Sequence, residues 1–161
     1  MKKLKIFVWI AVLLLIQTCL LPYIKIKNLA PELLFVFSVC YALQEKEWNF
    51  QFFVPILCGA AVDWMGGQFF GANTILYMLS SMLGIWAAGI FYQSGTIFQL
   101  PLIFVLSLLL GSGYFLLHAK SFLETGFGAV LWNMILPTAG LNTVCVLIML
   151  PLMQKTLKQR R

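Results

Sequence analysis

The chain has 161 residues, of which 61% are hydrophobic and only 10% are charged, and its mean hydropathy is +0.94. A soluble fold must present polar surface to water, so this composition excludes ordinary soluble domains and predicts an all-α integral membrane protein. The net charge of +6 is therefore informative mainly through its distribution along the chain. No hydrophilic stretch is long enough for a soluble catalytic module, and a single domain over residues 1–161 is expected.

Apolar segments separated by short polar links predict six transmembrane helices, each about long enough to cross a hydrocarbon core of roughly 30 Å. The predicted spans are residues 6–23, 31–43, 52–69, 73–92, 100–117 and 129–153. The basic start and the following apolar run imitate a secretory signal, but no small-residue cleavage site follows. The segment is therefore predicted to remain as the first span.

Prolines and glycines mark the ends and irregularities of these spans. Pro31 is predicted at the first position of the second helix, where its missing N–H costs nothing, and Glu32 in the first turn favours the helix dipole. The third span is the least certain, because it is short if it stops at Asp63. The sixth is long and contains Pro137, which predicts tilting or kinking.

The distribution of basic residues predicts the orientation. With the N-terminus inside, the inner segments hold eight Lys and Arg residues and the outer segments hold three. This asymmetry follows the positive-inside rule and predicts that both termini are cytoplasmic. The five tryptophans fall mostly near predicted span ends, as an aromatic belt requires.

Asp63 is the only charged side chain clearly inside the apolar spans. An ionisable group there costs about 2.5 to 3.5 kcal/mol on an insertion scale, so it usually has a partner. Gly59, Asp63 and Gly67 share one helix face if the helix continues, and small residues at this spacing let another helix approach closely. Asp63 is interpreted as a structural anchor between the third and fourth spans in preference to a proton or substrate site.

Other polar residues lie near Asp63 or on the last span. Asn73 and Tyr77 are four residues apart at the start of the fourth span and would face Asp63 across a turn at Gly71. On the last span, Thr138 and Asn142 share a face and Asn133 lies nearby. One hypothesis is a small polar pocket lined by Asp63, Asn73, Asn133 and Asn142. The favoured alternative is that these residues form separate helix contacts.

The residues that usually carry catalysis or bind cofactors are scarce. The four cysteines lie in apolar segments without a CxxC pair, and His118 is the only histidine. A single histidine builds neither a metal site nor a catalytic triad. Glycine-rich phosphate loops and nucleic-acid-binding features are also absent from the sequence. A non-enzymatic protein without a cofactor, metal or nucleic-acid partner is expected, with the lipid bilayer as its surroundings.

The stretches PELLFVFSVCYAL, GAAVD and FFGANTILYML, in this order, resemble the MreD family of bacterial rod-shape-determining membrane proteins. That family has a Pro and a polar residue at the head of its second helix, a Gly four residues before an Asp, and a further Gly about eight residues later. The closing ILPTAGLNTVCVLIMLPLMQKTLKQRR resembles the family's last helix and basic tail. The matching residues are Pro31, Glu32, Gly59, Asp63, Gly71, Pro137, Asn142 and Pro151.

This resemblance implies a non-catalytic scaffold of the cell-elongation machinery that helps to regulate lateral peptidoglycan synthesis. Its direct partner would be the single-span protein MreC, and its indirect partners a glycan polymerase, a penicillin-binding transpeptidase and MreB filaments. The family's compact six-helix bundle is similar to the substrate-binding subunits of vitamin transporters. A subunit of an energy-coupling vitamin transporter is therefore the alternative function.

Overall fold

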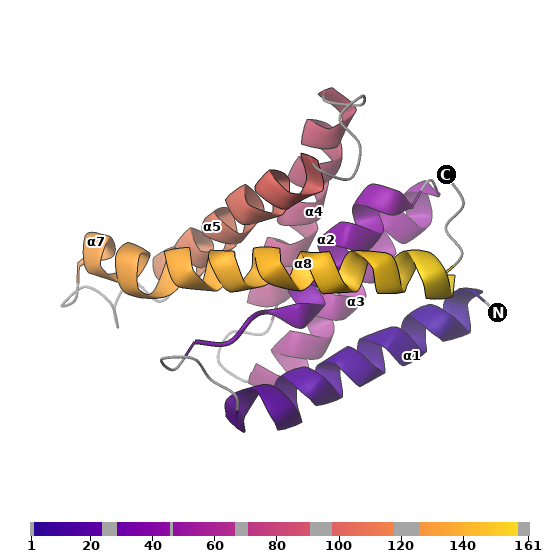
Figure 1. Cartoon of the computed structure of the whole chain (residues 1–161), viewed down its shortest axis with the longest axis horizontal. Helices are drawn as coiled ribbons and strands as arrows, with labels where there is room; N and C mark the ends of the chain where they lie inside the picture. Colours follow the sequence, from indigo (N-terminus) through magenta and orange to yellow (C-terminus); the bar gives the residue numbers. More distant parts are fainter. Residues whose placement is uncertain are drawn as a thin grey trace.

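The computed structural model describes residues 2–23, 29–45, 47–66, 71–90, 98–117 and 126–157. Within these ranges the chain forms a bundle of helices without a β-strand (Figure 1). The predicted all-α fold class is therefore confirmed for the described part of the chain. The candidate residue Gly67 and the loop around His118 lie outside the described residues.

Six helical stretches make up this bundle. They are α1 (Lys2–Leu15) with a π-helical turn (Ile16–Leu20) and a 3-10 turn (Leu21–Tyr23), α2 (Leu33–Gln44), α3 (Trp48–Gly66), α4 (Ala72–Ile90), α5 (Gln99–Leu117), and α7 (Phe127–Val130) continued by a π-helical turn (Leu131–Ile135) into α8 (Leu136–Leu157). Each corresponds to one predicted span. Helix α1 begins and helix α8 ends at the same end of the molecule (Figure 1).

Helix α2 forms the centre of the bundle. Its residues 34–42 are all buried, and the helix contacts α1, α3, α4, α5 and α8. A helix that is apolar on every side belongs in an interior, which explains why LLFVFSVCYAL lacks a polar face. Aromatic rings fill the space around it: Trp9 of α1 stacks on Phe37, and Phe35 packs edge to face against Tyr77 of α4. The position of every other helix is therefore set by contact with α2.

Four stretches are long and apolar enough to cross a membrane: Lys3–Tyr23, Ala72–Ile90, Gln99–Leu117 and Phe127–Lys155. Helix α2 is not one of them, because its 12 residues extend only about 18 Å at 1.5 Å per residue. Helix α3 has 19 residues, but Asn49, Gln51 and Asp63 lower its mean hydropathy. Length and composition thus identify four membrane-crossing helices where the sequence predicted six.

Two of the helix boundaries that differ from the prediction lie next to the polar residues of interest. Helix α3 begins at Trp48, four residues before the predicted start at residue 52. Helix α2 begins at Leu33, so Pro31 lies before the helix and Glu32 is its N-cap residue instead of a first-turn residue. The physical reason is that Glu32 adopts φ −91° and ψ 83°, outside the helical region, while its carbonyl already accepts the first bond from Val36 N–H at 3.0 Å.

The irregular turns in α1 and before α8 both precede a proline. Pro22 and Pro137 lack the N–H that would donate to the carbonyl four residues earlier, and each follows closely after a π-helical turn. The helix from Phe127 to Leu157 is nevertheless continuous. The kinking expected near Pro137 takes the form of a widened turn.

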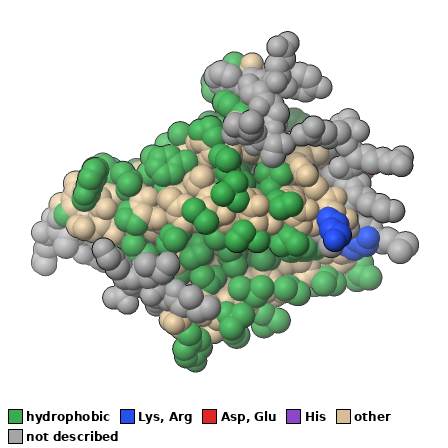
Figure 2. All heavy atoms as spheres, viewed as in Figure 1, with side chains coloured by type: hydrophobic (Ala, Val, Ile, Leu, Met, Phe, Trp, Pro, Cys, Tyr) green, Lys and Arg blue, Asp and Glu red, His purple; other side chains and the backbone are tan. Residues whose placement is uncertain are grey.

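The described outer surface is largely apolar. Figure 2 shows hydrophobic side chains over most of the visible face, with basic side chains at the end where α1 begins and α8 ends. Four tryptophans, Trp48, Trp64, Trp86 and Trp132, are exposed near helix ends. Large apolar residues exposed along whole helices are characteristic of a surface that faces lipid.

Candidate functional site

The N-terminus of α2 lies inside the protein, so its first N–H groups need partners from other helices. The backbone N–H of Glu32 donates to Oδ1 of Asn142 on α8, at 2.8 Å. The backbone N–H of Leu34 donates to Oε1 of Gln17, in the π-helical turn that follows α1, at 3.1 Å. Two helices far apart in the sequence therefore cap the central helix.

The side chain of Glu32 points into a polar cluster. Its Oε2 accepts a hydrogen bond from the hydroxyl of Tyr77, which is completely buried on α4, at 3.2 Å. Tyr114 of α5 lines the same cavity as Glu32. Asn142, which caps the backbone of Glu32, donates from Nδ2 to Oγ of Ser107 on α5 at 3.3 Å. Side chains from α4, α5 and α8 thus surround Glu32, and Tyr77 of α4 donates to its carboxylate.

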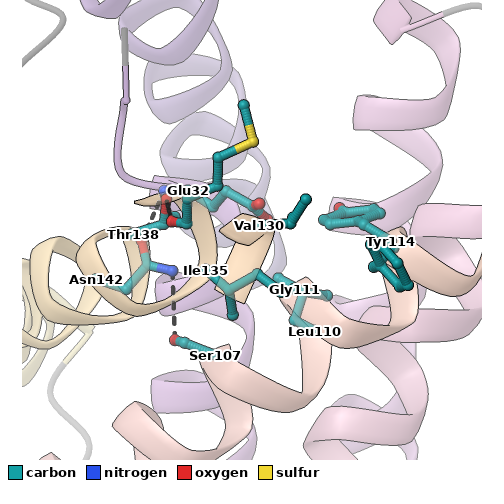
Figure 3. A pocket seen from close by; sticks show the side chains of 11 residues that line it. Glu32, Ser107, Leu110, Gly111, Tyr114, Val130, Ile135, Thr138 and Asn142 are labelled. Carbon is teal, nitrogen blue, oxygen red and sulfur yellow. Dashed lines mark hydrogen bonds between the residues drawn. The ribbon is translucent and has the colours of Figure 1, made fainter. Parts of the chain in front are cut away.

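A cavity of about 140 Å³ opens beside this cluster, between α5 and the stretch from α7 to α8 (Figure 3). Its lining is Glu32, Ser107, Leu110, Gly111, Tyr114, Phe115, Val130, Met134, Ile135, Thr138 and Asn142. The dashed lines in Figure 3 show Asn142 bridging from Glu32 to Ser107 along one side of it. The cavity therefore combines a mostly apolar wall with one carboxylate.

Asp63 makes the second polar centre, near the end of α3. Its Oδ1 accepts from the backbone N–H and from Nδ2 of Asn73, at 3.0 and 2.9 Å. Its Oδ2 accepts from the backbone N–H and from Oγ1 of Thr74, at 3.0 and 2.6 Å. These residues occupy the first turn of α4, where backbone donors lack intrahelical partners. Asp63 thus acts as an N-cap supplied by the neighbouring helix.

Two glycines make this contact geometrically possible. A Cβ on Gly59 would lie 2.4 Å from the Cα of Thr74, so only glycine lets α3 and α4 approach this closely. Gly71, directly before α4, has φ +98°, a conformation that L side chains rarely adopt. The predicted close approach at Gly59 and the predicted contact between Asp63 and Asn73 are both present.

The two polar centres are connected. The Tyr114 hydroxyl donates to Oδ1 of Asn73, the same residue whose amide and backbone donate to Asp63. Tyr114 also lines the cavity that contains Glu32. Hydrogen bonds therefore link α3, α4 and α5, and the last residue of this series, Tyr114, borders the cavity of Glu32.

The predicted polar set is divided between these centres. Asn142 and Thr138 line the cavity, and Thr138 also donates to the carbonyl of Met134 on its own helix. Asn133 donates to the carbonyl of Ala129 and is not among the lining residues. Asp63 and Asn73 belong to the cap of α4. The set therefore does not gather around one pocket, and Tyr77 reaches Glu32 instead of Asp63.

Several residues of the two centres escaped the sequence analysis. Glu32 is a second acid within the bundle, which corrects the interpretation of Asp63 as the only one. Gln17 and Ser107 are polar residues in strongly apolar helical segments, a signal that could have identified them. Glu45, in the link between the second and third predicted spans, is buried at the end of α2 and accepts from the Tyr41 hydroxyl at 2.6 Å.

The described residues contain no group of three His, Cys, Asp or Glu side chains able to hold a metal ion. The chemistry that the cavity offers is that of hydrogen-bond acceptors around one carboxylate. Comparisons of the chain with protein-family models, curated proteins and solved structures found no match.

Proposed function

We propose that this protein is a multi-pass scaffold of the bacterial inner membrane that belongs to the MreD type and binds an MreC-like single-span protein. The proposal rests on the ordered motifs that resemble the MreD family. The structural observation that supports it is the use of Asp63 and Asn142, two of the motif residues, to cap other helices. Side chains occupied in this way maintain a fixed arrangement of helices, as a non-catalytic scaffold requires.

The proposal includes six membrane crossings with both termini in the cytoplasm. Helix α2 covers about 18 Å of the membrane thickness that the second span must cross. Residues 29–32 before it would add at most about 13 Å, at roughly 3.3 Å per residue in a fully extended chain, which would bring the total close to the roughly 30 Å of a hydrocarbon core. Non-helical backbone is tolerated at this depth because the bundle satisfies its polar groups, as at Glu32 and Leu34.

The outer apolar faces are the surfaces available to a partner helix. Three of these faces contain a leucine that is about half exposed: Leu79 on α4, Leu109 on α5 and Leu147 on α8. Helix association in a membrane depends on such packing, with small and polar residues contributing locally. On this proposal one of the three faces carries the partner and the others contact lipid.

Co-expression with an MreC-like protein tests the proposal. A photoreactive amino acid placed at Leu79, Leu109 or Leu147 should crosslink the partner from one face, and the solubilised protein should co-purify with it. An unrelated single-span protein expressed at the same level serves as the control. The absence of both co-purification and crosslinking from all three positions would reject the scaffold.

The cavity supports a second candidate, a substrate-binding subunit of an energy-coupling vitamin transporter. Its volume of about 140 Å³ is below the roughly 300 to 1,000 Å³ of typical ligand pockets, which makes this candidate the weaker one. A thermal-shift screen against vitamins separates the two. Stabilisation by one vitamin would support the carrier, and a uniformly negative screen would count against it.

A further inference from the structure

Glu32 lies near the middle of the proposed membrane-spanning bundle. Its backbone partner Asn142 stands fifteen residues after Phe127 and fifteen before Leu157, at the centre of the longest helix. Ser107, the next residue in the chain of contacts, is eight residues after the start of α5 and ten before its end. The Glu32 carboxylate is therefore placed at mid-depth, where an ionisable side chain is costly and usually functional.

The cavity beside Glu32 contains no Lys, Arg or His among the described residues that line it. Its hydroxyl groups present mainly acceptor oxygens: Thr138 donates its hydrogen to Met134 O, and Tyr114 donates to Asn73. A carboxylate accepts about four hydrogen bonds, so the donor from Tyr77 leaves acceptor capacity on Glu32. The site thus favours a ligand that donates hydrogen bonds and carries positive charge.

The rest of the lining restricts the ligand's size and shape. Leu110, Val130 and Ile135 supply much of the apolar lining (Figure 3). An apolar cavity of about 150 Å³ accommodates a molecule as large as benzene, so about 140 Å³ leaves room for roughly six non-hydrogen atoms. Such a ligand has one charged end and a short apolar tail.

We propose that the cavity between α5 and α8 is a binding site for a small primary ammonium compound, whose charged group pairs with Glu32 and whose tail contacts Leu110, Val130 and Ile135. Pairing supplies the positive charge that a carboxylate at this depth lacks from the described cavity lining. The site goes beyond the scaffold function: it rests on the membrane-spanning arrangement proposed above, but not on the binding of a partner protein.

The experiment measures binding of n-butylammonium to the purified full chain by its effect on thermal unfolding. Butanol and butyrate, of similar size, serve as the neutral and the anionic comparison. The expected result is a concentration-dependent rise in Tm with butylammonium, and at least a tenfold weaker effect of the other two compounds. Preference for butanol or butyrate, or no response to any of the three, would overturn the proposal.

Two variants assign the binding to the cavity. Glu32→Gln should weaken the apparent affinity for butylammonium at least tenfold, whereas Glu47→Gln, the same chemical change outside the cavity lining, should leave it unchanged. Thr138→Leu fills the cavity from α8 without altering Glu32, and it should also abolish the response. This variant still tests the proposal if Glu32→Gln fails to fold. An unchanged response in Thr138→Leu, or equal losses in Glu32→Gln and Glu47→Gln, would show that butylammonium binds elsewhere.

Discussion

Replacement of Asp63 by Asn tests whether the cap between α3 and α4 depends on a carboxylate. Both oxygens of Asp63 accept two hydrogen bonds, one pair from Asn73 and one from Thr74. An Asn side chain has only one oxygen, and its NH₂ group would face two donors. An acid that accepted a single bond would tolerate this change, but an acid that accepts four cannot retain them all.

The expected cost follows from the number of lost bonds. Hydrogen bonds inside membrane proteins contribute about 0.6 kcal/mol on average and up to about 1.7 kcal/mol. Two lost bonds at a side chain that is only 4% exposed should therefore lower the free energy of unfolding by about 2 kcal/mol. Asp63→Ala removes all four acceptor contacts and should cost about 4 kcal/mol on the same basis.

Unfolding in mixed micelles, followed by loss of helical circular dichroism with increasing SDS, measures these differences. A double-mutant cycle with Thr74→Val, which removes only the Oγ1 donor, should give a coupling of about 1 kcal/mol because the two side chains share a bond. Glu47→Gln provides a control for the loss of an acidic group outside the cap. Wild-type stability of Asp63→Asn, or strict additivity with Thr74→Val, would refute the reasoning.

Two further substitutions test the packing and the cap of the central helix. Gly59→Ala places a Cβ 2.4 Å from the backbone of Thr74 and should destabilise the bundle by about 1 to 3 kcal/mol. Gly89→Ala, with open space around it, should be neutral. Equal stabilities of the two variants in the same SDS titration would contradict the close contact at Gly59. Gln17→Ala removes the acceptor of Leu34 N–H and should lower the free energy of unfolding by about 1 to 2 kcal/mol. Gln17→Glu keeps an acceptor and should unfold at a higher SDS concentration than Gln17→Ala.

The helices themselves were predictable because long apolar runs separated by short polar links leave few alternatives. The contact at Asp63 was predictable for a similar reason. Gly59 and Asp63 lie one turn apart on a helix, and Asn73 follows after a short glycine-containing turn, so local spacing brings the groups together. The donors from Thr74 were not foreseen, although they follow from the same placement of the α4 N-terminus.

The position of Glu32 was not predictable from local spacing. Its partners Tyr77 and Asn142 reach it from two different helices, across large separations in sequence. The sequence placed Glu32 near a helix start, a common position for an acid, and nothing local indicated that the start lies inside the bundle. The short length of α2 does indicate this position, because a helix of 12 residues cannot extend across a bilayer.

The two acids illustrate how the number of donors decides what a carboxylate in an apolar chain can do. Asp63 is surrounded by four donors from one helix terminus, which satisfies its acceptor sites and fixes α4 against α3. At Glu32, the backbone N–H donates to Asn142 to complete the cap of α2. The Glu32 carboxylate is not needed for that cap and is directed towards a cavity. Asp63 is therefore suited to structure, and Glu32 to binding a ligand that brings its own donors.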